Sequence, residues 1–397
     1  MFKRNLFFIL VFFLCLNLFS RDSDFSKKLS ELSNNIDISN DSLFNLLKHW
    51  DQYTQPDSTG VYIVYENIIN DTLTAPYVVY ISSSYDLNKK TPLLVYLHGG
   101  IIMPDFIDKP IEYAQDNPFV TFAENNNWLM LFPLGNIHTM WWDIVGIENI
   151  KSQINSVKEK FNIDDDRIYI TGFSDGGSAS FHFALNDPSY FAAFYPLNGM
   201  ISVGHSVTNI PVFLQNLQNR HLRVINTDED ALYPSEEMWK LMDLASQAGA
   251  DLLYKEYWGI GHSFEYAEEE IPLMIEDMKN QSRNIFHNNI YWETSIPEFG
   301  KTDWIEIIEL DTLEFSKPWQ KEYNVKLVNK RIQFGFYHEQ NFEGKGVLIR
   351  DIVENSASEE MGLQKNDIIM GMDNIITETL DSLLYLRNKK KRGDTFS

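Results

Sequence analysis

Cysteine is nearly absent from this chain of 397 residues, whose only one is Cys15. Cys15 lies in an N-terminal apolar run, so the chain beyond that run can form neither a disulfide bond nor a cysteine nucleophile. Hydrophobic packing alone must therefore hold the folded protein together. The composition is adequate for this, because 44% of the residues are hydrophobic and 14% are aromatic, and these values exclude global disorder.

Basic residues are scarce beside acidic ones. The chain has 33 Lys and Arg against 56 Asp and Glu, a formal net charge of −23. This balance disfavours binding to polyanions, so no nucleic-acid partner is expected, and the basic run at 389–392 is interpreted as a solvated helix end. Motifs with metal-ligand spacing, a phosphate-binding loop and a dinucleotide fingerprint are missing too, so neither a metal nor a cofactor is expected.

Long hydrophobic segments are missing as well. The apolar run at 6–19 follows two basic residues and ends at a serine, which is the layout of a secretory signal peptide at 1–20. It is shorter than the roughly 20 apolar residues of a stable membrane span. Lipid anchoring at Cys15 is disfavoured, because Leu14 stands where lipoprotein signals carry a small residue. We therefore expect a secreted or periplasmic protein without a stable membrane span.

The rest of the chain divides into segments of different texture. Residues 21–56 are polar with helical apolar spacing, which predicts a helical N-terminal extension. Residues 57–283 alternate strand and helix patterns, and this alternation predicts an α/β fold with a mainly parallel sheet flanked by helices. The predicted strands span 61–65, 77–81, 93–97, 128–132, 167–171, 222–226 and 252–257, and the clearest helices span 150–161 and 236–248.

The alternation stops near position 284. Residues 284–330 predict a β-rich linker segment, with antiparallel strand material expected at 290–292, 304–310 and 323–328. Residues 331–397 have a third texture, in which glycine recurs, and are interpreted as a small β-rich domain of their own.

The strongest motif is Gly-Phe-Ser-Asp-Gly-Gly at 172–177, directly after a strand pattern and before small residues that begin a helix. This context indicates a nucleophile elbow, a sharp strand-to-helix turn that exposes a strained serine, here Ser174. Gly172 and Gly176 suit the turn, because two backbones approach closely there. A serine hydroxyl needs a base and the base needs an orienting acid, so the motif predicts both further along the chain.

His262 is the predicted base, because it lies in a loop directly after the last strand of the α/β segment, in Gly-Ile-Gly-His-Ser-Phe. His98 and His138 also lie near strand ends, but both precede the serine, whereas the chain order with such an elbow is nucleophile, acid, histidine. The acid is expected after the strand at 222–226, where positions 228–230 hold three carboxylates.

Backbone amides for a developing oxyanion are predicted at two places. Gly99 and Gly100 directly follow the buried strand at 93–97, where small residues let main-chain amides face the site. The amide of Asp175, next to the serine, is the second predicted donor.

These motifs together resemble the α/β-hydrolases of the feruloyl esterase and poly(3-hydroxybutyrate) depolymerase branch over residues 61–280. The resemblance rests on the strand and double glycine at 93–100, the double glycine of the elbow, Asn-Ile-Asp at 162–164 with Arg167, and Gly-x-Gly-His-Ser. It implies an α/β-hydrolase fold and a serine esterase activity.

The resemblance also implies two further sets of site residues. Asp230 is the expected acid, because Asp-Ala-Leu-Tyr-Pro resembles the family's acid-x-x-hydrophobic-Pro segment, and Asp228 is the alternative. Trp141 and Trp142 fall where that branch places aromatic residues in the wall of the substrate pocket, although packing in the core is an equal alternative.

The C-terminal segment at 331–397 resembles a PDZ domain. Phe334, Gly335 and Phe336 look like its carboxylate-binding loop, and the Ser-x-Ala, Gly-Leu and Asp-x-Ile elements follow in the family's order, with Asn366 in place of a glycine. The resemblance implies that this domain binds a peptide C-terminus by strand addition, the alternative being a domain that packs on the hydrolase and binds nothing. Such domains close with a strand after the groove helix, and we expect this last strand to be lacking here.

The sequence therefore predicts a secreted or periplasmic serine hydrolase that cleaves carboxylic esters through an acyl-enzyme and carries a peptide-binding module. Two alternatives stay open. A peptidase of the prolyl oligopeptidase kind would use the same triad, and the PDZ-like segment suits peptide recognition, but the chain has no room for a propeller. A non-catalytic peptide-binding protein is disfavoured by the complete triad.

Overall fold

A computed structural model describes residues 38–48, 53–102, 105–310, 324–325, 334–339, 342, 344–353, 356–388 and 390. The predicted signal peptide and Cys15 lie outside the described residues. The first 54 residues form a unit by themselves. In it the structure describes one helix, α2 (Asn40–Lys48), which lies within the predicted helical extension.

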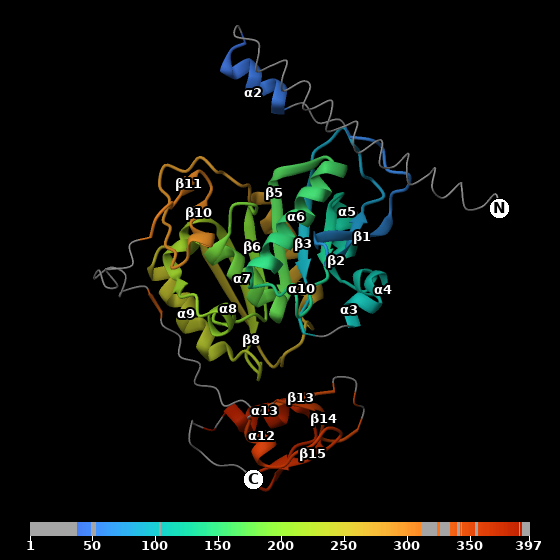
Figure 1. Cartoon of the computed structure of the whole chain (residues 1–397), viewed down its shortest axis with the longest axis vertical. Coiled ribbons are helices and arrows are strands. Elements are labelled where there is room, and N and C mark those ends of the chain that lie inside the picture. The colour runs from blue at the N-terminus through green and yellow to red at the C-terminus, as the bar shows by residue number, and fades with distance from the viewer. Residues whose placement is uncertain are drawn as a thin grey trace, which may run out of the picture. The chain divides into compact units, whose positions relative to one another are not determined.

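The α/β part of the chain is built on one sheet of eight strands (Figure 1). Their order is β1-β2-β4-β3-β5-β6-β8-β9. The first two pairings, β1 with β2 and β2 with β4, are antiparallel, and the others are parallel. The strands are β1 (Val61–Asn70), β2 (Leu73–Ile81), β3 (Thr91–Leu97), β4 (Leu129–Pro133), β5 (Ile163–Phe173), β6 (Ala193–Leu197), β8 (His221–Thr227) and β9 (Leu252–Tyr257).

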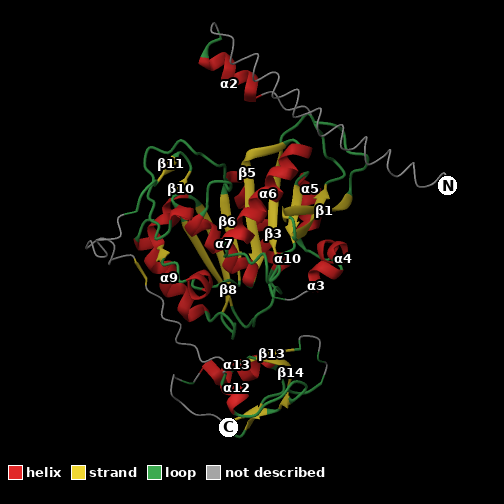
Figure 2. Ribbon diagram, viewed as in Figure 1, coloured by secondary structure: helices red, strands yellow, loops and turns green. Residues whose placement is uncertain are grey.

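Helices cover both faces of this sheet (Figure 2). Successive residues of a strand point to opposite faces, so β3 sends Leu93, Val95 and Leu97 into one hydrophobic cluster and Leu94 and Tyr96 into the other. The first cluster includes residues of α6 (Ile144–Lys160), α7 (Asp175–Asn186) and α9 (Ser235–Gln247), and the second includes residues of α4 (Pro110–Gln115), α5 (Phe119–Asn126) and α10 (Ala267–Asn280). Shorter elements are α3 (Asp105–Asp108), α8 (Val203–Thr208), β7 (Val212–Phe213) and η1 (Leu214–Asn219).

This arrangement is the α/β-hydrolase fold, and it confirms the predicted α/β class. The carboxyl ends of the parallel strands meet at one edge of the sheet, where ligands of open α/β sheets bind. The sequence prediction missed β6, whose five residues include Pro196 and are buried on both faces. A short buried run without alternation cannot be distinguished from a piece of helix by its pattern.

The segment after α10 returns along the opposite edge of the sheet. It contains η2 (Pro297–Phe299), β10 (Lys301–Thr302) and β11 (Ile305–Glu306). The two strands β10 and β11 pair as a small antiparallel hairpin. The predicted strand at 290–292 is not a strand. The side-chain amide of Asn219 instead donates to the carbonyl oxygen of Tyr291 (2.6 Å) and accepts from its N–H (3.2 Å), so side-chain amides take the place of a neighbouring strand.

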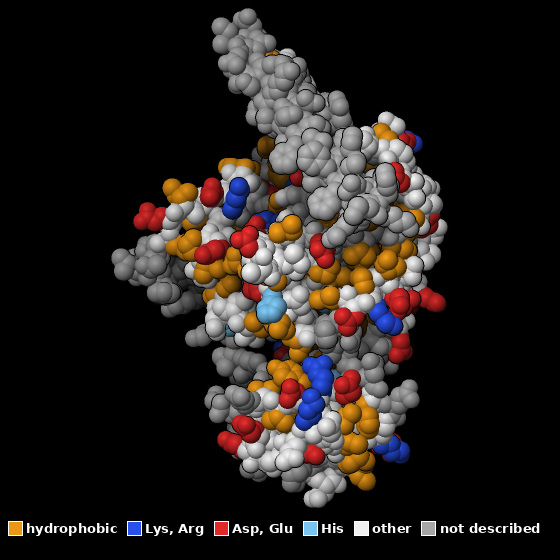
Figure 3. Space-filling view, turned by 45° about the vertical axis from the view of Figure 1, so that its right-hand side comes forward, with side chains coloured by type: hydrophobic (Ala, Val, Ile, Leu, Met, Phe, Trp, Pro, Cys, Tyr) orange, Lys and Arg blue, Asp and Glu red, His pale blue; other side chains and the backbone are white. Residues whose placement is uncertain are grey.

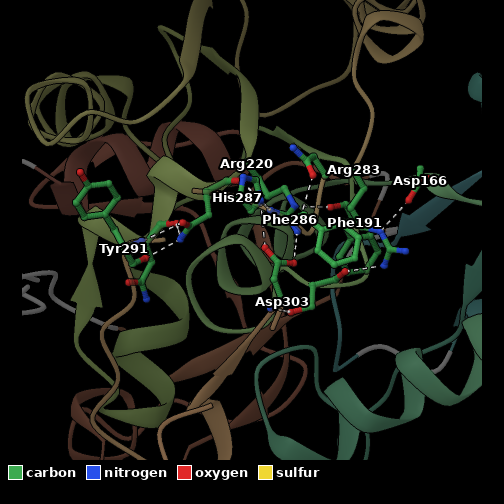
Figure 4. Close-up of polar contacts among 12 residues, drawn as sticks. Asp166, Phe191, Arg220, Arg283, Phe286, His287, Tyr291 and Asp303 are labelled. Atoms are coloured by element: carbon green, nitrogen blue, oxygen red, sulfur yellow. Dashed lines mark hydrogen bonds and ion pairs between the residues drawn. The ribbon is translucent and has the colours of Figure 1, made fainter. Parts of the chain in front are cut away.

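A buried arginine joins this returning segment, residues 283–306, to the start of β8 (Figure 4). Arg220 donates to the carbonyl oxygen of Phe191 (2.8 Å), to the Nε2 atom of His287 (2.8 Å) and to a carboxylate oxygen of Asp303 (2.5 Å). Arg283 donates to the carbonyl oxygen of Ser189 (2.9 Å). The segment is therefore held by polar contacts as well as by packing.

The C-terminal part is small and has its own hydrophobic cluster around Val347, Met372 and Leu383. Its three-stranded sheet has the order β13-β14-β15, and a two-stranded ribbon, β16 and β17, follows. The elements are β13 (Phe336–His338), β14 (Val347–Ile352), α12 (Ala357–Glu360), β15 (Ile368–Ile369), β16 (Gly371–Met372), β17 (Ile375–Ile376) and α13 (Leu380–Asn388). Before it, β12 (Asn324–Val325) pairs with β7. Whether this part is a PDZ domain stays a prediction.

The surface agrees with the acidic composition. On the face drawn in Figure 3, acidic side chains are scattered among hydrophobic and neutral ones, and basic side chains stand singly or in small groups. Among the described residues, no helix is long and apolar enough to cross a membrane.

Candidate active site

Ser174 occupies a sharp turn between β5 and α7. Its backbone has φ 60° and ψ −118°, a region that side-chain-bearing residues rarely adopt and that costs about 1–3 kcal/mol. The turn is tight because a Cβ at Gly172 or Gly176 would collide with the carbonyl oxygen of Leu97. The predicted elbow is therefore present in the backbone, and it holds the serine at the carboxyl end of a central strand.

A chain of two hydrogen bonds runs from this serine to a buried carboxylate. The Ser174 hydroxyl lies 2.8 Å from Nε2 of His262. The other ring nitrogen, Nδ1, lies 2.7 Å from a carboxylate oxygen of Asp230, which is fully buried. In this arrangement Nδ1–H donates to the carboxylate, and Nε2 can accept the proton of the serine hydroxyl. The three residues come from loops after β5, β8 and β9.

The two candidate acids have different places. Asp228 accepts a hydrogen bond from the backbone N–H of Gly259 (2.7 Å) and so closes the loop that leads to the histidine. Asp230 contacts the histidine itself, and its second oxygen accepts from the backbone N–H groups of Leu232 (2.9 Å) and Tyr233 (2.7 Å). Asp230 is thus the carboxylate that could orient His262.

Asn198 is a site residue that the sequence analysis missed. It follows β6 directly, is fully buried and has φ 42°, in the left-handed region. Its side-chain amide donates to the same oxygen of Asp230 that His262 contacts (3.0 Å), and to the hydroxyl of Thr227 (2.5 Å). Its amide oxygen accepts from the hydroxyl of Tyr266 (2.6 Å). The only signal in the sequence is an asparagine before a glycine, a pair that tolerates left-handed backbone.

The predicted oxyanion donors lie beside the serine. A Cβ at Gly99 would be 2.9 Å from the Cβ of Ser174, so only glycine permits this approach, and Gly100 has φ 58°. The amide of Asp175 is the first of α7 and has no partner inside the helix. The amide of Ile101, by contrast, donates to the Asp175 carboxylate (3.0 Å), so it does not face a substrate.

The His98 ring supports the loop of Gly99 and Gly100 through hydrogen bonds. Burial lowers the pKa of His98 to about 4, although hydrogen bonds with Gly99 and Gly135 oppose the shift. The ring is therefore neutral: Nδ1–H donates to the carbonyl oxygen of Gly99 (2.8 Å), and Nε2 accepts from the backbone N–H of Gly135 (3.0 Å). This rules out His98 as the base and makes it a support of the glycine loop.

Trp141 and Trp142 lie in the hydrophobic core. Their side chains are 0% and 4% exposed, and the indole N–H of Trp141 donates to the carbonyl oxygen of His98 (3.1 Å). Side chains this deeply buried pack in the core, so their burial does not support a role in the wall of a substrate pocket. Half-buried aromatic rings beside the triad come instead from Phe173, whose ring centroid lies 4.9 Å from that of His262, and from Phe264, 5.8 Å from Phe173.

The predicted carboxylate-binding loop of the C-terminal part is ordered by two serines. Gly335 has φ 86°, and a Cβ there would collide with Ser356. The Ser356 hydroxyl donates to the carbonyl oxygen of Gly335 (3.0 Å), and the Ser358 hydroxyl donates to that of Phe334 (2.6 Å). The rings of Phe334 and Phe336 stack with centroids 5.4 Å apart.

The chemistry available at the serine is nucleophilic. A strained hydroxyl, a histidine in contact with it, a buried carboxylate and backbone amides are the parts of a covalent acyl-transfer site. Within the described ranges, no group of three or more His, Cys, Asp or Glu side chains is placed to hold a metal ion.

Comparison with known proteins agrees with this chemistry. Residues 137–292 match the dienelactone hydrolase family, a range that contains Ser174, Asp230 and His262. A bifunctional acetylxylan esterase/xylanase of Neocallimastix patriciarum is 28% identical over 152 residues, which are 37% of this chain and 22% of that protein. The chain thus spans about a fifth of the length of this relative. Both matches confirm the predicted class, a hydrolase enzyme of the esterase type.

Solved structures of low sequence identity also align with the chain. A thermostable esterase is 20% identical, with 56% of this chain and 63% of the other covered and a TM-score of 0.44. The S-formylglutathione hydrolase of Staphylococcus aureus is 16% identical, with 57% and 99% covered and a TM-score of 0.44. A ferulic acid esterase is also 16% identical, with 56% and 98% covered and a TM-score of 0.44.

Proposed function

We propose that this protein is a serine hydrolase that cleaves carboxylic esters through an acyl-enzyme, with Ser174 as nucleophile, His262 as base and Asp230 as the orienting acid. The observation that carries the proposal is the pair of hydrogen bonds that joins the serine to the buried carboxylate through both ring nitrogens of His262 (2.8 Å and 2.7 Å). The strained backbone at the serine supports it, because such strain is kept where function requires it.

In the first half of the reaction, Ser174 Oγ forms a bond to the ester carbonyl carbon while its proton passes to Nε2 of His262. The carbonyl π electrons move to oxygen, and the oxyanion accepts hydrogen bonds from the amides of Asp175 and of Gly99 or Gly100. The bond from carbon to the alcohol oxygen then breaks, and His262 returns its proton to the departing alcohol. The product is an acyl-serine.

In the second half, a water molecule takes the place of the alcohol. His262 removes a proton from the water, whose oxygen attacks the acyl carbon. The collapse of the second oxyanion then breaks the bond to Ser174 Oγ, which takes the proton back from His262 as the acid is released. Asp230 accepts the hydrogen bond of Nδ1–H and stabilises the imidazolium that forms twice per turnover. Leu232, Tyr233 and Asn198 donate further hydrogen bonds to this carboxylate, which hold it in place beside the histidine.

Esters are the favoured substrates because the family match and the relative name hydrolases of this type. Assays on p-nitrophenyl esters of increasing acyl length beside aminoacyl anilides test this choice. We expect ester turnover in the wild type and none above background in Ser174→Ala or His262→Ala. Anilide cleavage that exceeds ester cleavage would instead favour the peptidase, and turnover that survives Ser174→Ala would overturn the triad.

A matched pair of variants tests the acid. Asp230→Asn should lower kcat by orders of magnitude, because loss of the triad acid leaves the histidine in the wrong tautomer, an effect of about 10⁴ in a known triad. Asp228→Asn changes a neighbouring carboxylate that contacts only backbone N–H groups in the described structure, and we expect a much smaller loss. The reverse ranking would mean that Asp228 is the acid.

For the C-terminal part we propose binding of a peptide C-terminus. β13 is an edge strand in the described sheet, and an edge offers backbone groups for strand addition. A cavity of about 470 Å³ lies between the β13–β14 hairpin and the start of α13, lined in part by His338, Val347 and Leu380. Fluorescence polarisation with peptide libraries on the full chain tests this. Binding that is lost when the peptide is amidated supports carboxylate recognition, and equal binding of both forms refutes it.

We also propose export through the signal peptide at 1–20. Expression of the full chain in a bacterial host, followed by fractionation and N-terminal sequencing, tests it. A periplasmic or medium form that begins near residue 21 supports export, and a cytoplasmic form that keeps residues 1–20 contradicts it.

A further inference from the structure

The carboxylate of Asp175 makes two long-range contacts that the reaction as described does not use. One oxygen accepts the backbone N–H of Ile101 (3.0 Å), and the other accepts the hydroxyl of Tyr233 (3.0 Å). The partners lie 74 and 58 residues away in the chain. We infer that Asp175 is a positioning residue that holds the oxyanion loop and the acid loop in register with the nucleophile, and this inference rests on the proposed function.

Each of the two loops carries one working part of the site. Ile101 directly follows Gly99 and Gly100, so its bond to Asp175 fixes where the glycine amides point. Tyr233 ends the loop that begins at Asp230, and its own N–H donates to that carboxylate (2.7 Å). The Tyr233 ring also meets the His262 ring edge-on, with centroids 5.5 Å apart. One carboxylate therefore connects the elbow to both loops.

The charge of Asp175 also favours a positioning role for its side chain. A carboxylate directly after the nucleophile lies near the place where an oxyanion must develop, and like charges repel. Electrostatics alone would disfavour an acidic residue here. Hydrogen bonds to an ionised acceptor are stronger than hydrogen bonds between neutral groups. The benefit of a carboxylate at this position is therefore expected to be that it holds the two loops in fixed positions.

A competing explanation is purely local. Asp175 is the first residue of α7, and an acidic side chain in the first turn is favoured by the partial positive charge of a helix N-terminus. In that case only the charge matters. The two explanations differ in what asparagine can do, because an amide keeps one acceptor and gains a donor but has no charge.

The geometry lets asparagine retain both contacts. Its oxygen can accept the Ile101 N–H, and its amide can donate to the Tyr233 hydroxyl, which is able to rotate and accept. Asp175→Ala removes both. We expect Asp175→Ala to lower kcat about 100-fold, the scale of losing one oxyanion donor, whereas Asp175→Asn stays within about 10-fold. KM should change less than about 2-fold in both, because oxyanion contacts act in the transition state.

A transition-state analogue separates positioning from a general loss of stability. The affinity of a trifluoromethyl ketone analogue of the best ester substrate should fall by the same factor as kcat/KM in Asp175→Ala. Tyr195→Phe is the matched control, since it removes a hydroxyl bonded to Asp277 (2.9 Å), away from the site. It should lower the melting temperature without changing kcat/KM or the affinity of the analogue.

The outcomes are distinct. Equal losses in Asp175→Ala and Asp175→Asn, or full activity in Asp175→Ala, overturn the inference. If Asp175→Ala does not fold, Tyr233→Phe takes its place and should lower kcat about 10-fold with KM unchanged, the lower end of what one hydrogen bond to a charged group contributes. An unchanged kcat there also overturns the inference. Failure of the proposed function would appear separately, as ester turnover that survives Ser174→Ala.

Discussion

Replacing Asn198 should destabilise the α/β part strongly, and by different amounts for glycine and alanine. Both substitutions remove the amide that donates to Asp230 and accepts from Tyr266. Loss of a hydrogen bond to a charged group costs about 1.5–3 kcal/mol, and a buried hydroxyl left without a partner costs about 1–3 kcal/mol. Since these effects overlap at one buried site, we expect Asn198→Gly to lower the free energy of unfolding by about 3 kcal/mol.

Alanine should cost more because of the backbone. Asn198 has φ 42°, and an alanine in the left-handed region pays about 1 kcal/mol that glycine does not. Asn198→Ala should therefore lose about 4 kcal/mol. Asn209 is the control, because it is exposed, has φ 60° and caps α8 through its backbone. The difference between its alanine and glycine variants measures the backbone effect alone.

Urea unfolding followed by tryptophan fluorescence measures these values. Residues 334–397 contain no tryptophan, and seven of the nine tryptophans lie at 128–304, so the signal reports mainly the α/β part. An unchanged slope against urea is needed for the comparison to be one of stability. A loss below about 1 kcal/mol in Asn198→Gly would refute the reasoning that the buried amide is required. Equal losses for glycine and alanine at Asn198, with a difference at Asn209, would refute the assignment of strain.

Two further predictions concern ionisation, one concerns metal removal and one concerns domain structure. Burial raises the pKa of Glu293 to about 7, so its ionisation opposes folding as pH rises from about 4.5, and Glu293→Gln should be more stable than wild type at pH 8 but not at pH 4 in urea titrations. Burial alone would lower the pKa of His221, but the carboxylates of Asp277 and Asp251 outweigh it and raise the pKa. The stabilisation is therefore present below about pH 6.5 and is lost as pH rises through the raised value, so His221→Gln should be less stable than wild type at pH 6 and equal at pH 9. Ester turnover should survive EDTA, and a loss that added metal restores would contradict the serine mechanism. Limited proteolysis should remove the C-terminal part and leave an active species near residues 22–330, whereas a resistant tail would mean one cooperative unit.

The alternation of strands and helices was readable from the sequence because buried parallel strands form continuous apolar runs. The meeting of Ser174 and His262 could be expected for a related reason. The glycines around Ser174 mark the elbow, because a sharp strand-to-helix turn has no room for side chains at those positions. A histidine that follows a later parallel strand lies at the same edge of the sheet. The choice between Asp228 and Asp230 needed coordinates, since both follow β8 and only the turn between them decides which one faces the histidine.

Other parts of the site depend on contacts that leave no pattern. Asn198 follows a short strand without periodicity, and the value of its amide comes from Asp230 and Tyr266, which are distant in the chain. For Trp141 and Trp142 the resemblance implied a pocket wall and left core packing as an equal alternative, and the structure buries both, with Trp141 packed against Gly135 and bonded to His98. The extended chain at 290–292 has the composition of a strand. Its backbone hydrogen bonds are made by side-chain amides, and a strand pattern in the sequence does not reveal such contacts.

The contact between Arg220 and Asp303 closes a loop of 83 residues, the topological task that a disulfide performs in many exported proteins. An ion pair differs from a disulfide in the conditions under which it forms and breaks. It forms without an oxidant or an isomerase, and reducing agents leave it closed. For a chain with no cysteine beyond position 15, the closure of this loop is therefore independent of the redox potential in which the protein folds.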